Sequence, residues 1–337
     1  MESFKKISAF FFAALFVLTA VPALIAFNFD RRAFTAETYQ RAFAKQDFYN
    51  KIPTVLAQTM ATMSTDQTQL PIVVRGMDAS AWEVFFRNLL PQETLKVMGD
   101  DTLSSIFAYL NMQTNSAQIS LVPLKASMVN DTGVQAAFTI LNTQPECTLD
   151  QVFQMTINLF ATGELQFCKP PAQLYPMLTP MIQGQMQMAA LAVPDQVIII
   201  TAPPENDPRM HLQTIRRVMR FSPFVPLGFL VLMTIFAVNS LKSWLNWWGI
   251  SFFITGAITG LMGLAGAPIF GAIFHRVLVA RMPIYLPAIL LDFASDLASA
   301  MIQALLNPVL WQGLAIFLFG SAMIVGAFAT TAVKKMV

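Results

Sequence analysis

The fold is decided by a stretch near the N-terminus, residues 7–27, which reads ISAFFFAALFVLTAVPALIAF. These 21 residues carry no charge, and Lys5 and Lys6 come directly before them. A lipid hydrocarbon core about 30 Å thick is crossed by roughly 20 apolar residues in a helix, which satisfies its own backbone hydrogen bonds. The stretch predicts a transmembrane helix. A cleaved signal peptide is the alternative, because small residues lie near Pro22.

Three further uncharged runs predict three more transmembrane helices, at residues 222–241, 250–274 and 309–333. The composition agrees, because 55% of the 337 residues are hydrophobic and only 12% are charged, against about a quarter in soluble domains. A net charge of +2 supplies no basic field for nucleic acid, so we expect the lipid bilayer as a partner and no nucleic acid.

The charges gather in one region, since 30 of the 40 lie between Asp30 and Arg220. Residues 28–221 therefore predict a water-exposed domain inserted between helices 1 and 2. Most of its patterns are helical, but residues 118–124 and 196–201 look like two strands that pair with each other. The predicted fold is an integral membrane, mostly α-helical protein with a small two-stranded β element in that domain.

Orientation follows from lysines and arginines near the ends of the helices. An inside N-terminus places five lysines in the cytoplasm, Lys5, Lys6, Lys242, Lys334 and Lys335. We therefore expect a multi-pass protein of the cell membrane with cytoplasmic N- and C-termini and an extracytoplasmic domain. Arginines beside the domain oppose this orientation, but long translocated domains largely escape the charge rule.

Cys147 and Cys168 are the only cysteines, and both lie in the inserted region. A disulfide between them fits an oxidising compartment, which agrees with an extracytoplasmic domain. The alternatives are a free buried pair, or two ligands of a metal site, for which His211 is the only histidine in the domain.

A fifth apolar segment, residues 283–307, carries a polar stripe at helical spacing. The stripe consists of Asp292, Asp296, Ser299, Gln303 and Asn307. One interpretation is an amphipathic helix at the membrane interface or packed on its neighbours. The other is a spanning or re-entrant helix whose carboxylates line a polar path.

Small residues and tryptophans mark two further features. Gly256, Gly260 and Gly263 in the third helix predict close packing, either within the four helices or against a second copy. Three tryptophans between residues 242 and 248 predict a short inner loop anchored at the membrane boundary.

The sequence holds no zinc-protease motif, nucleophile elbow, Walker loop or dinucleotide fingerprint. We therefore predict no catalytic residues, no cofactor and no metal site.

The layout resembles that of uncharacterised bacterial multi-pass membrane proteins. The matching residues are Leu90-Pro91, Ala108-Tyr109-Leu110, Cys147, Cys168-Lys169-Pro170-Pro171 and Trp247-Trp248-Gly249. The resemblance implies an N-terminal helix, a helical extracytoplasmic domain with a cysteine pair, and three C-terminal helices, but no activity. The topology is also similar to permease subunits of cell-division and lipoprotein-type ABC systems, although the short cytoplasmic segments here offer little surface to an ATPase.

Three functions stay open. The first is a non-enzymatic protein whose outer domain binds a protein partner, or a second copy, and supports assembly of a membrane complex. The second is a transport, channel or permease-type component that uses Asp292 and Asp296. The third is an enzyme, but the sequence contains no recognisable set of catalytic or metal-binding residues.

Overall fold

The computed structural model describes residues 2–63, 77–148, 150–151, 153, 168–281 and 288–336. Within them the chain is mostly helical, with one two-stranded sheet. Four long helices are α1 (Glu2–Ala33), α11 (Phe224–Ala237), α12 (Leu241–Arg281) and α13 (Ala288–Met336). The elements between α1 and α11, here called the inserted domain, are α2 (Ala36–Lys45), α3 (Phe48–Met63), α4 (Ala79–Leu89), α5 (Gln92–Leu110), β1 (Ser116–Ser120), α6 (Val122–Val129), α7 (Asp131–Asn142), the short 3-10 helix η3 (Ala172–Leu174), α9 (Tyr175–Ala192), β2 (Gln196–Thr201) and α10 (Pro208–Phe221).

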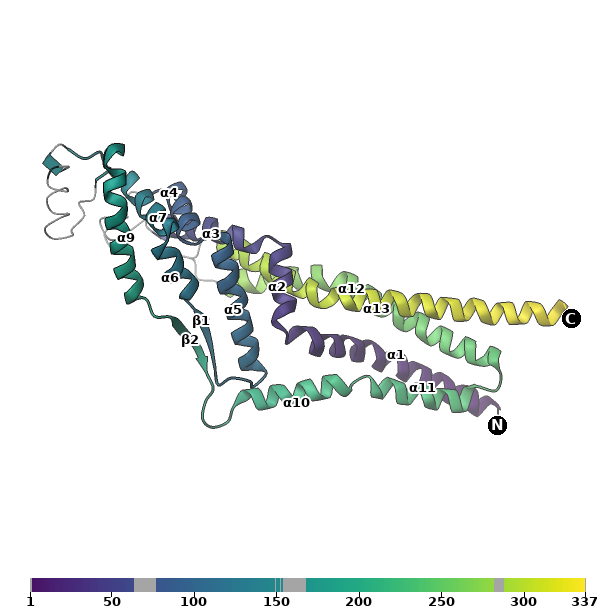
Figure 1. Cartoon of the computed structure of the whole chain (residues 1–337). Coiled ribbons are helices and arrows are strands. Elements are labelled where there is room, and N and C mark those ends of the chain that lie inside the picture. Colours follow the sequence, from purple (N-terminus) through teal and green to yellow (C-terminus); the bar gives the residue numbers. More distant parts are fainter. Residues whose placement is uncertain are drawn as a thin grey trace.

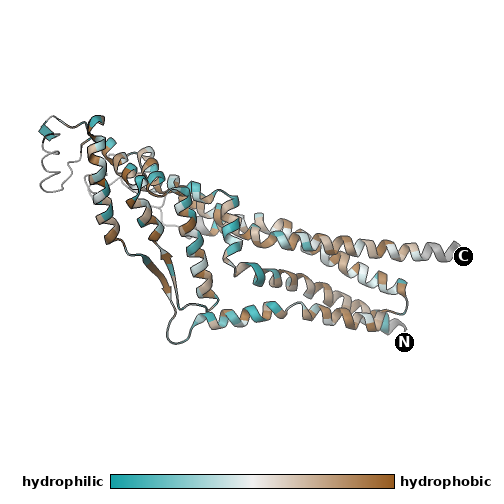
Figure 2. Ribbon diagram, viewed as in Figure 1, coloured by the Kyte–Doolittle hydropathy of each residue, from teal (hydrophilic) through white to brown (hydrophobic). Residues whose placement is uncertain are grey.

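Four segments of the described chain are long and apolar enough to cross a membrane, namely Lys5–Ala33, Pro208–Ala237, Leu241–Val277 and Ile289–Thr330. Both chain termini lie at one end of the molecule, and the inserted domain lies at the other (Figure 1). Apolar residues run along the four long helices, whereas the domain is mixed (Figure 2). The prediction of a mostly helical protein with four candidate membrane-spanning segments and a small two-stranded sheet is confirmed.

The predicted boundaries of the last three membrane segments need correction. α13 is one helix from Ala288 to Met336 and continues through Pro308, so the predicted separation of 283–307 from 309–333 is wrong. A proline removes one helical hydrogen bond, but neighbouring helices in a membrane bundle tolerate that loss. Residues 283–287 lie outside the described residues. The predicted inner loop is also helical, because α12 begins at Leu241.

Glycines bring the backbones of α12 and α13 together. A Cβ atom on Gly256 would lie 2.3 Å from the backbone nitrogen of Phe317, and one on Gly263 would lie 2.8 Å from backbone atoms of Leu310. Gly260 differs, because a Cβ atom added there would meet no other atom within 4 Å. The backbone of Gly260 instead lies against Gly313. This close contact lies within one chain.

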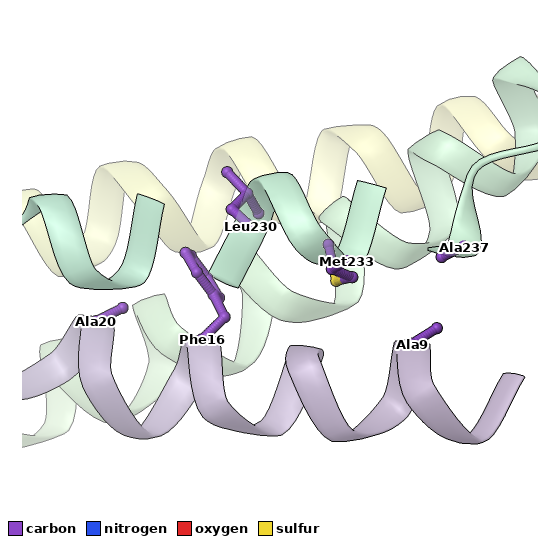
Figure 3. Close-up of a cluster of buried hydrophobic side chains, with 6 residues drawn as sticks. All are labelled: Ala9, Phe16, Ala20, Leu230, Met233 and Ala237. Atoms are coloured by element: carbon purple, nitrogen blue, oxygen red, sulfur yellow. The ribbon is translucent and has the colours of Figure 1, made fainter. Parts of the chain in front are cut away.

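α1 and α11 form the second helix pair. Ala9, Phe16 and Ala20 of α1 point toward Leu230, Met233 and Ala237 of α11 (Figure 3). All six side chains are buried. Trp247 and Trp248 of α12 pack against this cluster, and the indole nitrogen of Trp248 donates to the Thr234 hydroxyl at 3.0 Å. These tryptophans therefore join α12 to α11.

The two strands of the inserted domain pair antiparallel, with Ser116 opposite Thr201 and Ser120 opposite Gln196. The predicted pairing is confirmed, but the first strand ends at Ser120 instead of continuing to Leu124. Pro123 lies in the first turn of α6, where its missing N–H costs nothing and its fixed φ favours a helix.

Cys147 and Cys168 form a disulfide, as predicted. Cys168 is buried in a cluster with Val134, Leu141, Leu178 and Ile182. The bond therefore ties the end of the α7 region to the start of α9. It closes the segment between the two cysteines, most of which lies outside the described residues.

We expect removal of this bond, by Cys147→Ser with Cys168→Ser, to lower the free energy of unfolding by about 3 kcal/mol. A disulfide that closes a loop of this length restricts the unfolded chain by roughly that amount. Thermal unfolding of the purified protein, with and without reductant, measures the effect. Sensitivity to reductant in the double variant would contradict it.

Gly256→Ala should destabilise the α12–α13 pair by about 1–3 kcal/mol, because its methyl group overlaps the backbone of α13. Gly260→Ala is the matched control, since its methyl group meets open space. Thermal unfolding in detergent measures both. Equal melting temperatures for the two variants would show that close helix contact at Gly256 contributes nothing.

Candidate functional site

A buried carboxylate marks the place where the long helices meet the inserted domain. Asp30, near the end of α1, is only 3% exposed. The Nε atoms of Arg216 and Arg220 lie 3.1 and 3.3 Å from its two oxygens. Arg216 also lies over the ring of Phe34, 4.4 Å from its centre, and donates to the Asn111 side chain. A buried charge is tolerated only with such partners.

An amide pair lies two residues, about 3 Å, before this carboxylate on α1. Asn28 donates to Gln312 of α13 at 2.6 Å, and Gln312 donates back at 3.2 Å. Asn28 is buried. We call Asn28, Asp30, Arg216, Arg220 and Gln312 the boundary layer. It links α1, α10 and α13 with polar bonds at the domain end of the apolar helices.

The start of α10 is anchored by a second buried arginine. The guanidinium of Arg209 donates to the carbonyl oxygens of Tyr109 and Thr114, at 3.0 and 2.7 Å. It also pairs with Asp207, Nη2 to Oδ2 2.7 Å. The hydrogen bond from Arg209 is the largest of the effects that lower the pKa of Asp207. Arg209 at the start of α10 and Arg216 in its second half thus point into the protein and fix the helix.

These inward arginines turn the apolar side of α10 outward. Its exposed apolar side chains are Met210, Ile215, Val218 and Phe221, and His211, Thr214, Arg217 and Arg220 are exposed among them. Four apolar side chains of β2 are exposed as well, Val197, Ile198, Ile199 and Ile200. We call these eight apolar residues the apolar strip. A short loop connects its two halves, and the strip continues into α11, whose Phe224, Val225 and Leu227 are also exposed.

The predicted polar stripe lies on the first half of α13, which packs against α2 and α3 of the inserted domain. Asp292, Asp296, Gln303 and Asn307 are exposed, and Ser299 is half-buried. Asp296 lines a small pocket together with Lys51 of α3. The stripe therefore lies beside the contact with the domain, which is made by the apolar side chains Phe293, Leu297, Met301 and Ala304.

A larger pocket lies between α2 and α13, with a volume of about 370 Å³. Gln303 and Asn307 of the stripe contribute to its wall. The wall also holds Thr38, Gln46 and three cations, Arg32, Arg41 and Lys45.

The sequence analysis missed the boundary layer, the inward arginines of α10 and the basic pocket. A signal was present for Gln312, which interrupts an otherwise apolar run, and for Asn28, which ends one. The sequence does not indicate that Arg32, Lys45 and Asn307 line one pocket, because their proximity depends on how α2 packs on α13.

Among the described residues, no group of three or more histidine, cysteine, aspartate or glutamate side chains is arranged to hold a metal ion. The chain matches no family model, and comparisons with curated proteins and with solved structures gave no match.

The boundary layer predicts a strong effect for Asp30→Asn. The substitution leaves Arg216, whose side chain is 13% exposed, without a carboxylate, so the free energy of unfolding should fall by about 3–5 kcal/mol. Arg220→Gln is the control, because the Arg220 side chain is 63% exposed and its pair should contribute at most about 1 kcal/mol. Chemical unfolding in detergent measures both. A loss below 1 kcal/mol for Asp30→Asn would contradict the account.

Proposed function

We propose that this chain is a non-enzymatic multi-pass protein of the cell membrane whose extracytoplasmic domain binds a protein partner and supports assembly of a membrane complex. The apolar strip is the single observation that carries the proposal. Exposed apolar surface is uncommon on soluble domains and marks interaction sites. The β2 side chains carry this argument, because α10 lies within the segment Pro208–Ala237, which is apolar enough to cross a membrane, and lipid can cover its exposed apolar side chains.

The height of the strip favours a protein over lipid as its partner. α10 has 14 residues and is about 20 Å long. Its end at Ser222 is level with Ala23, whose carbonyl oxygen accepts a hydrogen bond from the Ser222 hydroxyl, so α10 rises about 13 Å beyond the level of Asn28. The headgroup region adds only about 5–7 Å on each side of the hydrocarbon core. Lipid can therefore cover the lower end of α10 but does not reach β2.

The sheet offers a partner hydrogen bonds as well as apolar side chains. β1 and β2 form a two-stranded sheet within the described residues, so the outer edge of β2 has no paired strand. An open edge with exposed apolar side chains can accept a strand from another protein. We infer that the partner covers β2 by strand addition and extends down α10.

Two features support the proposed orientation. Lys5 and Lys6 follow the N-terminus and Lys334 and Lys335 precede the C-terminus, at the end of the bundle that holds both termini (Figure 1). Lys242 belongs to the same end, because its neighbour Ser243 lines a pocket with Lys5 and Lys6. The disulfide is at the opposite end, where an extracytoplasmic domain meets an oxidising compartment.

The position of the polar stripe gives less support to the transport alternative. Asp292 and Asp296 are exposed side chains on a part of α13 that lies beyond the boundary layer. We therefore expect Asp292→Asn and Asp296→Asn to leave function intact, whereas deletion of the inserted domain abolishes it.

Photo-cross-linking in native membranes tests the proposal. A cross-linking amino acid at Ile198 or Val218, which are 58% and 67% exposed, should give a discrete protein adduct that mass spectrometry identifies. Val97 on α5 is the control, because it is also exposed, at 47%, but lies outside the strip.

An adduct with the mass of two copies would identify the partner as the chain itself and still support assembly. Adducts with lipid alone, or the same adduct from all three positions, would overturn the proposal. The substituted side chains are exposed, so folding should change by no more than about 0.5 kcal/mol.

A further inference from the structure

We propose that the basic pocket between α2 and α13 binds the phosphate group of an anionic membrane lipid. This site is separate from the apolar strip and does not depend on the proposed protein partner. Its wall combines three cations with neutral donors, Thr38, Gln46, Gln303 and Asn307, around three small residues, Ala42, Ala300 and Ala304. The small residues leave room for a ligand about the size of a lipid headgroup.

The charges in this pocket are largely uncompensated. No described aspartate or glutamate lines it. Arg32 and Lys45 form no ion pair with any described carboxylate. Arg41 pairs with Glu37 at 3.3 Å, but both side chains are well exposed, so water weakens that pair. Three cations beside one hollow are matched by an anion with several acceptor oxygens, such as a phosphate.

The depth of the pocket points to lipid as the source of that phosphate. Arg32 is four residues beyond Asn28 on α1, and Asn307 is five residues before Gln312 on α13. At 1.5 Å per residue, the pocket begins about 6–8 Å beyond the amide pair that joins the two helices. That height corresponds to the headgroup region of a bilayer. The apolar helices below would lie beside the acyl chains of the same lipid.

Native mass spectrometry of the full-length protein, delipidated in detergent, tests the proposal. The probes are phosphatidylglycerol, phosphatidylcholine and inorganic phosphate alone. We expect retention of phosphatidylglycerol over phosphatidylcholine. Arg32→Gln should weaken binding of phosphatidylglycerol about tenfold, the effect of one lost charge-assisted contact.

Arg31→Gln is the matched control, because Arg31 has the same charge and nearly the same depth but lies over Phe27 instead of in the pocket. Gln303→Glu is a second variant, which places a carboxylate in the pocket with almost no change of shape. It should weaken phosphatidylglycerol binding as Arg32→Gln does, with an unchanged melting temperature.

Three results would overturn the proposal. The first is equal binding of phosphatidylglycerol by the Arg31→Gln and Arg32→Gln variants. The second is equal retention of the anionic and the zwitterionic lipid. The third is displacement of phosphatidylglycerol by inorganic phosphate at comparable concentration, which would identify a soluble phosphate as the ligand.

Discussion

The buried carboxylate of Asp30 is the constraint on which the rest of the structure depends. It lies at the end of a membrane helix, where an unpaired charge is costly, and its partners come from α10. Pairing with Asp30 turns Arg216 inward, and Arg209 adds a second inward anchor at the other end of α10. The exposed side of the same helix carries Met210, Ile215, Val218 and Phe221. The electrostatics that hold the domain on the bundle therefore create the surface that we assign to a partner.

Much of the architecture could be predicted from the sequence because the membrane imposes simple rules of length and charge. Uncharged runs located the four apolar helices, and the two cysteines located the disulfide. The prediction was wrong at Pro308, where proline ended the predicted helix. Whether the helix continues through Pro308 depends on how α13 packs along α12. The sequence of α13 alone does not show that packing.

The candidate sites were harder to predict because they depend on contacts between distant residues. The polar stripe on α13 was recognised from its helical spacing, but its surroundings were not. In the structure Gln303 and Asn307 line the pocket beside α2, and Asp296 lines the one beside α3. Arg216 and Arg220 were visible as charges that oppose the predicted orientation. Their pairing with Asp30 explains why they tolerate this position. Gly256 and Gly260 belong to the same small-residue pattern in the sequence. Only the packing of α12 on α13 shows that a Cβ atom would clash at Gly256 and meet open space at Gly260.

Labelling of single cysteines with a membrane-impermeant maleimide in intact cells tests the central claim most directly. The two native cysteines are bonded to each other, so the background is low. The account predicts that Val97→Cys is labelled in intact cells, which places the domain outside. It also predicts that Ile198→Cys is labelled only after purification, because a partner covers β2 in the cell. Equal labelling of both positions in intact cells would show that the strip is uncovered, and labelling of neither until the membrane is opened would show that the domain is inside.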